Sequence, residues 1–215
     1  MKYKAVIFDM DGTILNTLED LKITTNYALK KFNMPERTFD EVRMFVGNGI
    51  RKLVERAVPE GTDEKKIDEV LDVFLKYYEK HNNDNTCAYP GIQNLVTELK
   101  KLGIKTAVST NKADAPAQEL GKIYFNGVFD LIVGQQEGRK IKPAPDSINL
   151  ILKKFGIEKK DAVYIGDSDV DIQTARNSEL DFIGVDWGFR GRTFLKEHGA
   201  EKIVSRAEEI LELVK

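Results

Sequence analysis

The sequence predicts an α/β protein with a doubly wound, Rossmann-like parallel sheet and an all-helical segment inserted after the first strand. Two observations predict this fold. Short, continuous apolar runs alternate with helical patterns along most of the chain, and the stretch between about residues 16 and 89 shows no convincing strand. Continuous apolar runs are typical of parallel strands buried on both faces, and their alternation with helices implies right-handed crossovers.

Five apolar runs are expected to form the strands of the sheet, at residues 5–8, 106–108, 131–133, 162–165 and 182–185. Between them, apolar side chains recur at intervals of three and four residues, which predicts amphipathic helices. The clearest of these stripes are Ile92, Leu95, Leu99 and Leu102, and Ile148, Ile151, Leu152 and Phe155. Each helix is therefore expected to connect two strands across a face of the sheet.

The stretch without strands is predicted to be helical. Thr17, with Asp20 three residues on, resembles a capping box and is expected to open a helix that runs to about Phe32. A long apolar stripe predicts another helix from about residue 63 to residue 82. Its members are Ile67, Val70, Leu71, Phe74, Leu75 and Tyr78. Gly47-Asn48-Gly49 is expected to separate two shorter helices.

These elements predict two domains. The core domain is expected to comprise residues 1–15 and 87–215, and the helical domain residues 16–86. Tyr89-Pro90-Gly91 is expected to return the chain to the sheet. Because the insert leaves the sheet just after the first strand, at the edge where such sheets bind ligands, it is positioned to act as a lid. A rigid extra layer on the core is the alternative.

Composition narrows the classes of partner. The 215 residues are 41% apolar and 32% charged, so there is ample material for a core. Lys and Arg number 33 against 35 Asp and Glu. This near balance gives no indication of a nucleic-acid partner or of an anionic membrane.

The expected compartment is the cytoplasm. Cys87 is the only cysteine, which excludes an intrachain disulfide and suits a reducing compartment. The first apolar run stops at Asp9, too early for a signal peptide. No apolar stretch approaches the roughly 18 residues of a membrane span.

Polar groups of the types that phosphate chemistry needs gather at the predicted strand ends. Asp9 and Asp11 follow the first strand, and Ser109-Thr110-Asn111-Lys112 follows the second. Gly166-Asp167-Ser168-Asp169-Val170-Asp171 follows the fourth, and Lys140-Ile141-Lys142-Pro143 lies in a loop before it. Because the carboxyl ends of parallel strands lie on one edge of a sheet, these groups can converge.

Chemistry gives these carboxylates different roles. A carboxylate cannot approach a phosphate dianion without charge neutralisation, and Asp9 and Asp167 can hold Mg²⁺, which prefers oxygen ligands. Asp9 can then attack phosphorus to give an aspartyl phosphate. Asp11 lies two residues on, on the same face of the extended chain. It can protonate the leaving oxygen and then deprotonate the attacking water.

The phosphate itself needs donors and positive charge. Thr110 and adjacent backbone N–H groups can donate to phosphoryl oxygens, and Lys142 supplies a compact positive charge beside them. Ser109 is an alternative hydroxyl donor, although the count from Ile104 favours Thr110. Lys140 is an alternative cation, although the Lys-Pro-x-Pro setting favours Lys142.

In this order, the motifs resemble the four motifs of the haloacid dehalogenase superfamily of phosphohydrolases. They are Phe8-Asp9-Met10-Asp11-Gly12-Thr13, Ser109-Thr110-Asn111-Lys112, Lys142-Pro143, and Gly166-Asp167-Ser168 with Asp171. The similarity covers essentially the whole chain, and the helical insert resembles the small helical cap of that superfamily. Val46-Gly47-Asn48-Gly49 and Val185-Asp186-Trp187-Gly188-Phe189 resemble its phosphoglycolate-phosphatase-like branch.

The resemblance implies a Mg²⁺-dependent phosphatase that works through an aspartyl phosphate. It implies Asp9 as the nucleophile and Asp11 as the acid/base. It also implies that Thr110, Asn111 and Lys142 bind the phosphate. The dehalogenases themselves lack the second aspartate, so Asp11 argues for phosphate esters as substrates.

The resemblance also implies the ligands of the metal. Mg²⁺ would be held by the carboxylates of Asp9 and Asp167 and by the backbone carbonyl of Asp11. Asp171 would act through metal-bound water or by orienting Lys142.

The substrate stays open at this point. A small phosphorylated metabolite such as phosphoglycolate is expected, while pyrophosphate, nucleotide or sugar phosphates and a phosphomutase reaction fit the same scaffold. In the insert, Asn48 and Arg51 are candidates for recognising the substrate, as is Arg43. The non-enzymatic alternative is a phospho-receiver domain, against which the first-strand motif and the large insert argue. A monomer and a homodimer both fit, with neither nucleic acid nor a membrane as partner.

Overall fold

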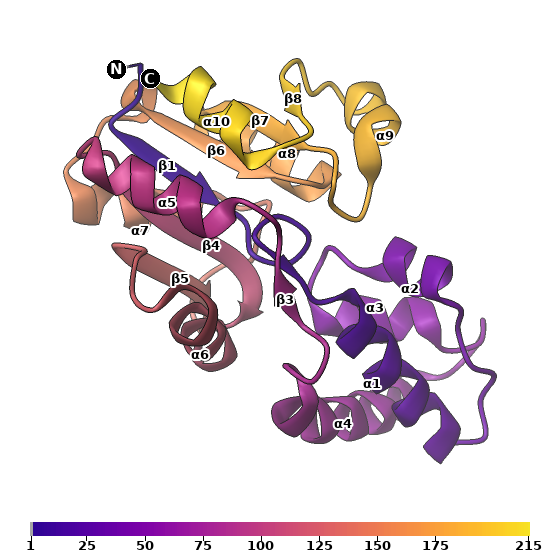
Figure 1. Ribbon diagram of the computed structural model, residues 1–215. Coiled ribbons are helices and arrows are strands. Elements are labelled where there is room, and N and C mark those ends of the chain that lie inside the picture. Colours follow the sequence, from indigo (N-terminus) through magenta and orange to yellow (C-terminus); the bar gives the residue numbers. More distant parts are fainter. Residues whose placement is uncertain (1) are drawn as a thin grey trace. The chain divides into compact units, whose positions relative to one another are not determined.

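A computed structural model describes residues 2–215, and the chain divides into two compact units. One unit consists of the chain up to Leu15 together with Ala88–Lys215, and the other is Asn16–Cys87. Figure 1 shows the first as strands flanked by helices and the second as a group of helices. The chain passes between them through β2 (Leu15–Asn16) and β3 (Cys87–Ala88), which pair in a two-stranded sheet.

A six-stranded sheet forms the centre of the α/β unit, with the strand order β5-β4-β1-β6-β7-β8. All neighbouring strands in it run parallel. The strands are β1 (Ala5–Phe8), β4 (Lys105–Ala113), β5 (Leu131–Gln135), β6 (Ala162–Gly166), β7 (Asp181–Val185) and β8 (Ile203–Val204). The expected doubly wound α/β fold is confirmed. Strands β2, β3 and β8 were not expected, because two residues are too few to give an apolar run.

Helices cover both faces of this sheet, and alternation along β1 decides which face each side chain enters. Val6 and Phe8 lie in a core with residues of α5, α6 and α10, whereas Ala5 and Ile7 lie in a core with residues of α7 and α8. A central strand needs apolar side chains at every position because successive residues face opposite ways. The helices of this unit are α5 (Ile92–Lys101), α6 (Asp114–Phe125), α7 (Asp146–Phe155), α8 (Asp169–Ser178), α9 (Gly191–Glu197) and α10 (Ala207–Val214).

The helical unit consists of α1 (Leu18–Lys31), α2 (Phe39–Phe45), α3 (Ile50–Ala57) and α4 (Glu64–His81). Side chains that satisfy free backbone N–H groups set two of its helix starts. Asp63 accepts a hydrogen bond from the backbone N–H of Lys66 at 2.9 Å, which opens α4. Thr38 and Glu41 form a capping box that opens α2.

The capping box expected at Thr17 and Asp20 is wrong. The Thr17 side chain makes no capping hydrogen bond to α1. The Asp20 side chain is buried, and it accepts hydrogen bonds from the backbone and side-chain nitrogens of Asn85 and from the Thr86 hydroxyl. Asp20 therefore ties the first turn of α1 to the residues that lead into β3.

This buried carboxylate makes Asp20→Ala a test of the helical unit's stability. The substitution removes the acceptor for three polar groups, so we expect the free energy of unfolding to fall by about 2–4 kcal/mol. Urea denaturation followed by circular dichroism measures the change. Glu19→Ala, on the exposed side of the same turn, is the matched control and should stay within about 0.5 kcal/mol of the parent. A loss no larger than that of the control would contradict the role given to Asp20.

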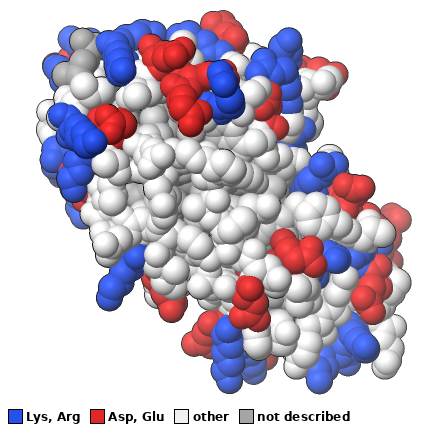
Figure 2. Space-filling model, in the orientation of Figure 1, with Lys and Arg blue, Asp and Glu red and all other residues white. Residues whose placement is uncertain are grey.

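Two surface properties bear on partners. No helix within residues 2–215 is long and apolar enough to cross a membrane. On the face shown in Figure 2, basic and acidic side chains are interspersed, as expected for a formal net charge of −2. That face therefore has no large positively charged patch that would attract a polyanion such as a nucleic acid.

Candidate active site

Polar side chains meet at the carboxyl edge of the sheet because of the strand register. Phe8, the last residue of β1, pairs with Val108 of β4 and with Ile165 of β6. The next residue, Asp9, therefore lies between the end of β6 and the last part of β4, which runs on through residues 109–112 to Ala113 instead of ending at residue 108 as expected. Its backbone N–H donates to the Ile165 carbonyl at 2.8 Å, which continues the ladder into the site.

Lys142 is the cation at the centre of the site. Its side chain is 3% exposed, and its Nζ lies 2.8 Å from Asp9 Oδ1 and 2.9 Å from Asp171 Oδ1. Nζ also donates to the Tyr164 hydroxyl at 2.8 Å. Burial alone would lower the pKa of Lys142, but the carboxylates of Asp171 and Asp9 raise it above its ordinary value. The ammonium group is therefore charged at neutral pH.

The Asn111 side chain fixes the backbone of Lys142. Asn111 Oδ1 accepts from the Lys142 N–H at 2.8 Å, and Asn111 Nδ2 donates to the Lys142 carbonyl at 3.1 Å. This reciprocal pair joins the loop that carries Lys142 to the end of β4.

Asp171 is saturated by donors from its own surroundings. Its Oδ1 receives Lys142 and the Tyr164 hydroxyl, the latter at 3.1 Å. Its Oδ2 receives the backbone N–H of Asp167 and both the N–H and hydroxyl of Ser168. Burial would raise the pKa of Asp171, but Lys142 and these hydrogen bonds hold it below its ordinary value. Asp171 is therefore an ionised anchor for Lys142.

Asp167 is held by two donors and enclosed by glycines. Thr13 Oγ1 donates to its Oδ1 at 3.1 Å, and the Phe189 N–H donates to its Oδ2 at 2.7 Å. A Cβ atom on Gly12 would lie 2.4 Å from Asp167 Oδ2, and one on Gly188 would lie 2.3 Å from Asp167 Cβ. Only glycine fits at either position. Burial and the charge of Asp171 raise the pKa of Asp167 to about 7.

These carboxylates suit a hard divalent cation. Asp9, Asp167 and Asp171 each offer an oxygen within 4.8 Å of the others'. Asp171 already accepts from five donors, whereas each oxygen of Asp167 accepts from one and keeps a lone pair for an ion, so Asp9 and Asp167 are the residues that could hold an ion. Burial and the charge of Asp171 also raise the pKa of Asp9 well above its ordinary value, although Lys142 opposes this. Two buried carboxylates that resist ionisation beside one lysine form a donor set that a divalent cation would stabilise.

The remaining strand-end residues separate into two groups. Lys112 Nζ lies 3.0 Å from Asp11 Oδ1, and the Lys112 N–H donates to Thr110 Oγ1 at 3.1 Å. The Ser109 hydroxyl, in contrast, is bonded to the Ser147 hydroxyl of α7 at 2.8 Å and is buried. Lys140 is exposed, whereas Lys142 is buried.

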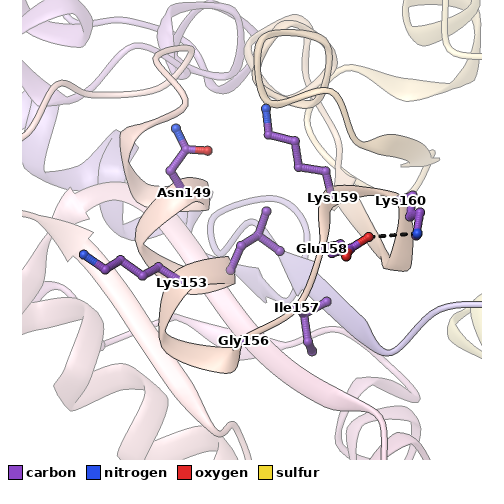
Figure 3. Close-up of a pocket in the computed structure, with 8 residues that line it drawn as sticks. Asn149, Lys153, Gly156, Ile157, Glu158, Lys159 and Lys160 are labelled. Carbon is purple, nitrogen blue, oxygen red and sulfur yellow. Dashed lines mark ion pairs between the residues drawn. The ribbon is translucent and has the colours of Figure 1, made fainter.

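A second hollow, of about 560 Å³, lies beside the C-terminal end of α7 (Figure 3). None of the strand-end site residues described above lines it. Two of the three lysines that line it are paired with glutamates, Lys159 with Glu179 and Lys160 with Glu158. Its lining offers no group of metal ligands, so the strand-end cluster is the candidate active site.

A family model described as haloacid dehalogenase-like hydrolase matches residues 6–185. The chain is a haloacid dehalogenase-like hydrolase. The match includes all four segments of the site, and the family expected from the motifs is confirmed.

Relatives of this hydrolase narrow the class of reaction. It is 30% identical to a phosphoglycolate phosphatase of Pseudomonas syringae pv. tomato over 92% of this chain and 75% of the relative. It is also 30% identical to a phosphoglycolate phosphatase of Aquifex aeolicus, over 86% of each chain. A solved structure from Lactobacillus delbrueckii subsp. bulgaricus, provisionally described as a phosphoglycolate phosphatase, shares 39% identity and a TM-score of 0.95, covering 100% and 99% of the two chains. The hydrolase is a phosphatase that acts on phosphoric monoesters.

The predicted recognition residues of the helical unit all have partners within that unit. Asn48 Oδ1 accepts from Arg56 Nη2 at 2.7 Å. The Arg51 guanidinium contacts three acidic side chains, those of Glu55, Glu64 and Asp68. Arg43 pairs with Asp40 at 3.1 Å.

Four contributors to the site of this hydrolase were given no individual role from the sequence, although Thr13 and Lys112 belong to the quoted motifs. They are the Tyr164 hydroxyl, the Thr13 hydroxyl, the Phe189 N–H and the Lys112 ammonium group. Tyr164 carried the clearest signal, because a phenol in a strand buried on both faces needs a hydrogen-bond partner. The others depend on close approaches that no local pattern reveals.

Tyr164→Phe tests the support of Lys142. The substitution removes one hydroxyl that contacts both Lys142 Nζ and Asp171 Oδ1, so we expect kcat/KM to fall about 10-fold through the lost hydrogen bonds to charged groups. Steady-state kinetics with a phosphomonoester measures the change. Tyr124→Phe on α6 is the matched control. Equal activity in Tyr164→Phe and the control would contradict a role of the Tyr164 hydroxyl in supporting Lys142.

Proposed function

We propose that this hydrolase is a Mg²⁺-dependent phosphatase for a small phosphomonoester, with phosphoglycolate as the first candidate, and that it works through an aspartyl phosphate on Asp9. The observation that carries the proposal is the ion pair of Lys142 with Asp9, held in place by Asp171 and lying beside Asp167. A buried lysine that is paired with the nucleophilic carboxylate places positive charge where a phosphoryl group would be transferred.

Mg²⁺ would be held by Asp9 and Asp167, with the backbone carbonyl of Asp11 as a further oxygen ligand. When bound, the cation supplies positive charge that offsets the repulsion between the carboxylates and a phosphate dianion. The Phe189 N–H and the Thr13 hydroxyl orient Asp167 for this purpose.

The reaction proceeds in two steps. An Asp9 carboxylate oxygen forms a bond to phosphorus, the bond to the leaving oxygen breaks, and Asp11 gives that oxygen its proton. Water then attacks phosphorus, Asp11 takes a proton from the water, and the acyl phosphate bond breaks to release inorganic phosphate.

Three residues bind the phosphoryl group or support its binding. Lys142 and the Thr110 hydroxyl donate to the phosphoryl oxygens and stabilise the developing charge. Asn111 supports phosphate binding indirectly, because its side chain hydrogen-bonds to both the N–H and the carbonyl of Lys142 and so holds the loop that carries Lys142.

The helical domain, residues 16–86, would provide the cap and much of the specificity. Its first residues follow Asp11 closely in the sequence, so a movement of this domain would displace the chain next to the proposed acid/base residue. Asn48 and Arg51 are the candidates for recognising the rest of the substrate. The present partners of Arg51 are surface carboxylates, which a substrate anion could replace at modest cost.

A substrate panel tests the proposed function. Phosphoglycolate, pyrophosphate, nucleoside monophosphates and hexose phosphates are assayed side by side, with Mg²⁺ and with EDTA. The expected result is Mg²⁺-dependent release of phosphate with phosphoglycolate preferred. Similar rates with all the phosphates would contradict phosphoglycolate as the preferred substrate. Transfer of phosphate between substrate hydroxyls would indicate a phosphomutase. Full activity in EDTA would contradict the requirement for Mg²⁺.

Metal binding should depend on pH in a defined direction. The pKa of Asp167 is raised to about 7, so the metal-free native state becomes less stable as pH rises from the ordinary aspartate range through that value. Mg²⁺ should offset this loss. We expect Mg²⁺ to raise Tm more at about pH 8 than at about pH 6, where a proton competes with the ion. A Tm shift that does not change with pH, or that persists in Asp167→Asn, would contradict the assignment.

A further inference from the structure

A second buried lysine, Lys112, forms an ion pair with Asp11, the proposed acid/base residue. Lys112 Nζ is 3.0 Å from Asp11 Oδ1, and the Lys112 side chain is only 3% exposed. We propose that Lys112 is a positioning residue that holds the Asp11 carboxylate in the geometry for proton transfer to the leaving oxygen. This inference rests on the proposed function, because it requires Asp11 to be the acid/base.

The backbone of Lys112 lies in an irregular part of β4, because the pairing with β5 shifts register between Ser109 and Ala113. Strand β4 extends through this residue to Ala113, which pairs with Gln135 of β5. The Lys112 N–H donates to Thr110 Oγ1 on the same strand. A lysine side chain loses much rotamer freedom when it is buried, so the buried ammonium group of Lys112 requires a strong partner, and Asp11 is one.

Asp11, in contrast, lies beyond the end of its strand. Strand β1 ends at Phe8, and Gly12, with φ of 85°, turns the chain directly after Asp11. The parallel ladder of the central sheet therefore does not set the direction of this carboxylate. Lys112 reaches it from the neighbouring strand and holds Oδ1 at 3.0 Å.

The two buried lysines thus serve different aspartates. Lys142 contacts Asp9, the proposed nucleophile, whereas Lys112 contacts Asp11. A defect in Lys142 should affect every substrate, because every substrate presents a phosphoryl group. A defect in Lys112 should matter most for leaving groups that need a proton, because a misplaced acid cannot deliver it.

Two probe substrates separate these effects. Phosphoglycolate has an alkoxide leaving group that needs protonation, whereas the leaving group of p-nitrophenyl phosphate departs without it. For Lys112→Met we expect kcat/KM to fall about 30- to 100-fold with phosphoglycolate and less than about 3-fold with p-nitrophenyl phosphate. Lys112→Arg should recover part of the loss. Lys105→Met, at the other end of β4 and paired with Asp130, is the matched control and should leave both values unchanged.

A double-mutant comparison completes the test. Adding Lys112→Met to Asp11→Asn should cause no further selective loss, because the group it positions is already disabled. Equal losses with both substrates, no loss, or a selective loss that persists in the Asp11→Asn background would overturn the role of Lys112. If Asp11→Asn itself shows no selective loss, the proposed function fails instead. Thermal melts check folding, and Lys112→Gln replaces Lys112→Met if the latter does not fold.

Discussion

Asp9→Asn should abolish turnover while leaving the fold intact. The amide cannot form the acyl phosphate and is a poorer ligand for a cation, so we expect kcat to fall by about 10⁴-fold or more. The metal-free variant should melt no lower than the parent at about pH 8, because burial makes the ionised Asp9 carboxylate unfavourable there. Phosphate release and differential scanning calorimetry in EDTA measure the two effects.

The control for this prediction is Asp161→Asn, an aspartate of the same unit that pairs with Lys4 near the surface. It should retain full activity. Residual turnover in Asp9→Asn above about 1% of the parent value would contradict a nucleophilic Asp9, because loss of a nucleophile costs several orders of magnitude.

Asp171→Ala should have the largest effect on stability. It leaves Lys142 buried with one carboxylate fewer and removes one acceptor of the Tyr164 hydroxyl and the acceptor of the Ser168 hydroxyl. Breaking a buried ion pair by removing one partner costs about 3–5 kcal/mol, and we expect a loss of that size together with near-complete loss of activity. Because the pKa of Asp171 is held below its ordinary value, its contribution is present at neutral pH and is lost as pH falls through that lowered pKa.

Urea denaturation at neutral pH and in acid measures this contribution. Asp169→Ala, two residues earlier on α8 and half-exposed, should change the free energy of unfolding by less than about 0.5 kcal/mol. A similar small change in Asp171→Ala would show that Lys142 does not depend on Asp171.

The strand ends were predictable because burial imposes a strong pattern. The β1 sequence is apolar at every position and stops at Asp9, and the same holds where β6 leads into Asp167. Once parallel strands are recognised, convergence of these carboxylates follows from topology alone. The class of fold and the identity of the site segments therefore depend on few residues.

Other features depend on partners far along the chain. Asp20 has the spacing of a capping residue, but its partners lie 65 and 66 residues away, and burial among them outweighs the local pattern. Arg51 flanks a glycine turn as a recognition residue would, yet its position is set by acids on α4. Tyr164 resembles any aromatic strand residue until Lys142 and Asp171 are placed beside its hydroxyl.

The most direct test of the central claim is to trap the aspartyl phosphate. Asp11→Asn with Mg²⁺ and p-nitrophenyl phosphate should form the intermediate but hydrolyse it slowly, because the base that activates water is missing. Acid quenching and peptide mass spectrometry should find one phosphoryl group on Asp9, and none when Mg²⁺ is replaced by EDTA or when Asp9→Asn is added. A burst of p-nitrophenol with no phosphoryl group on Asp9 would contradict Asp9 as the nucleophile.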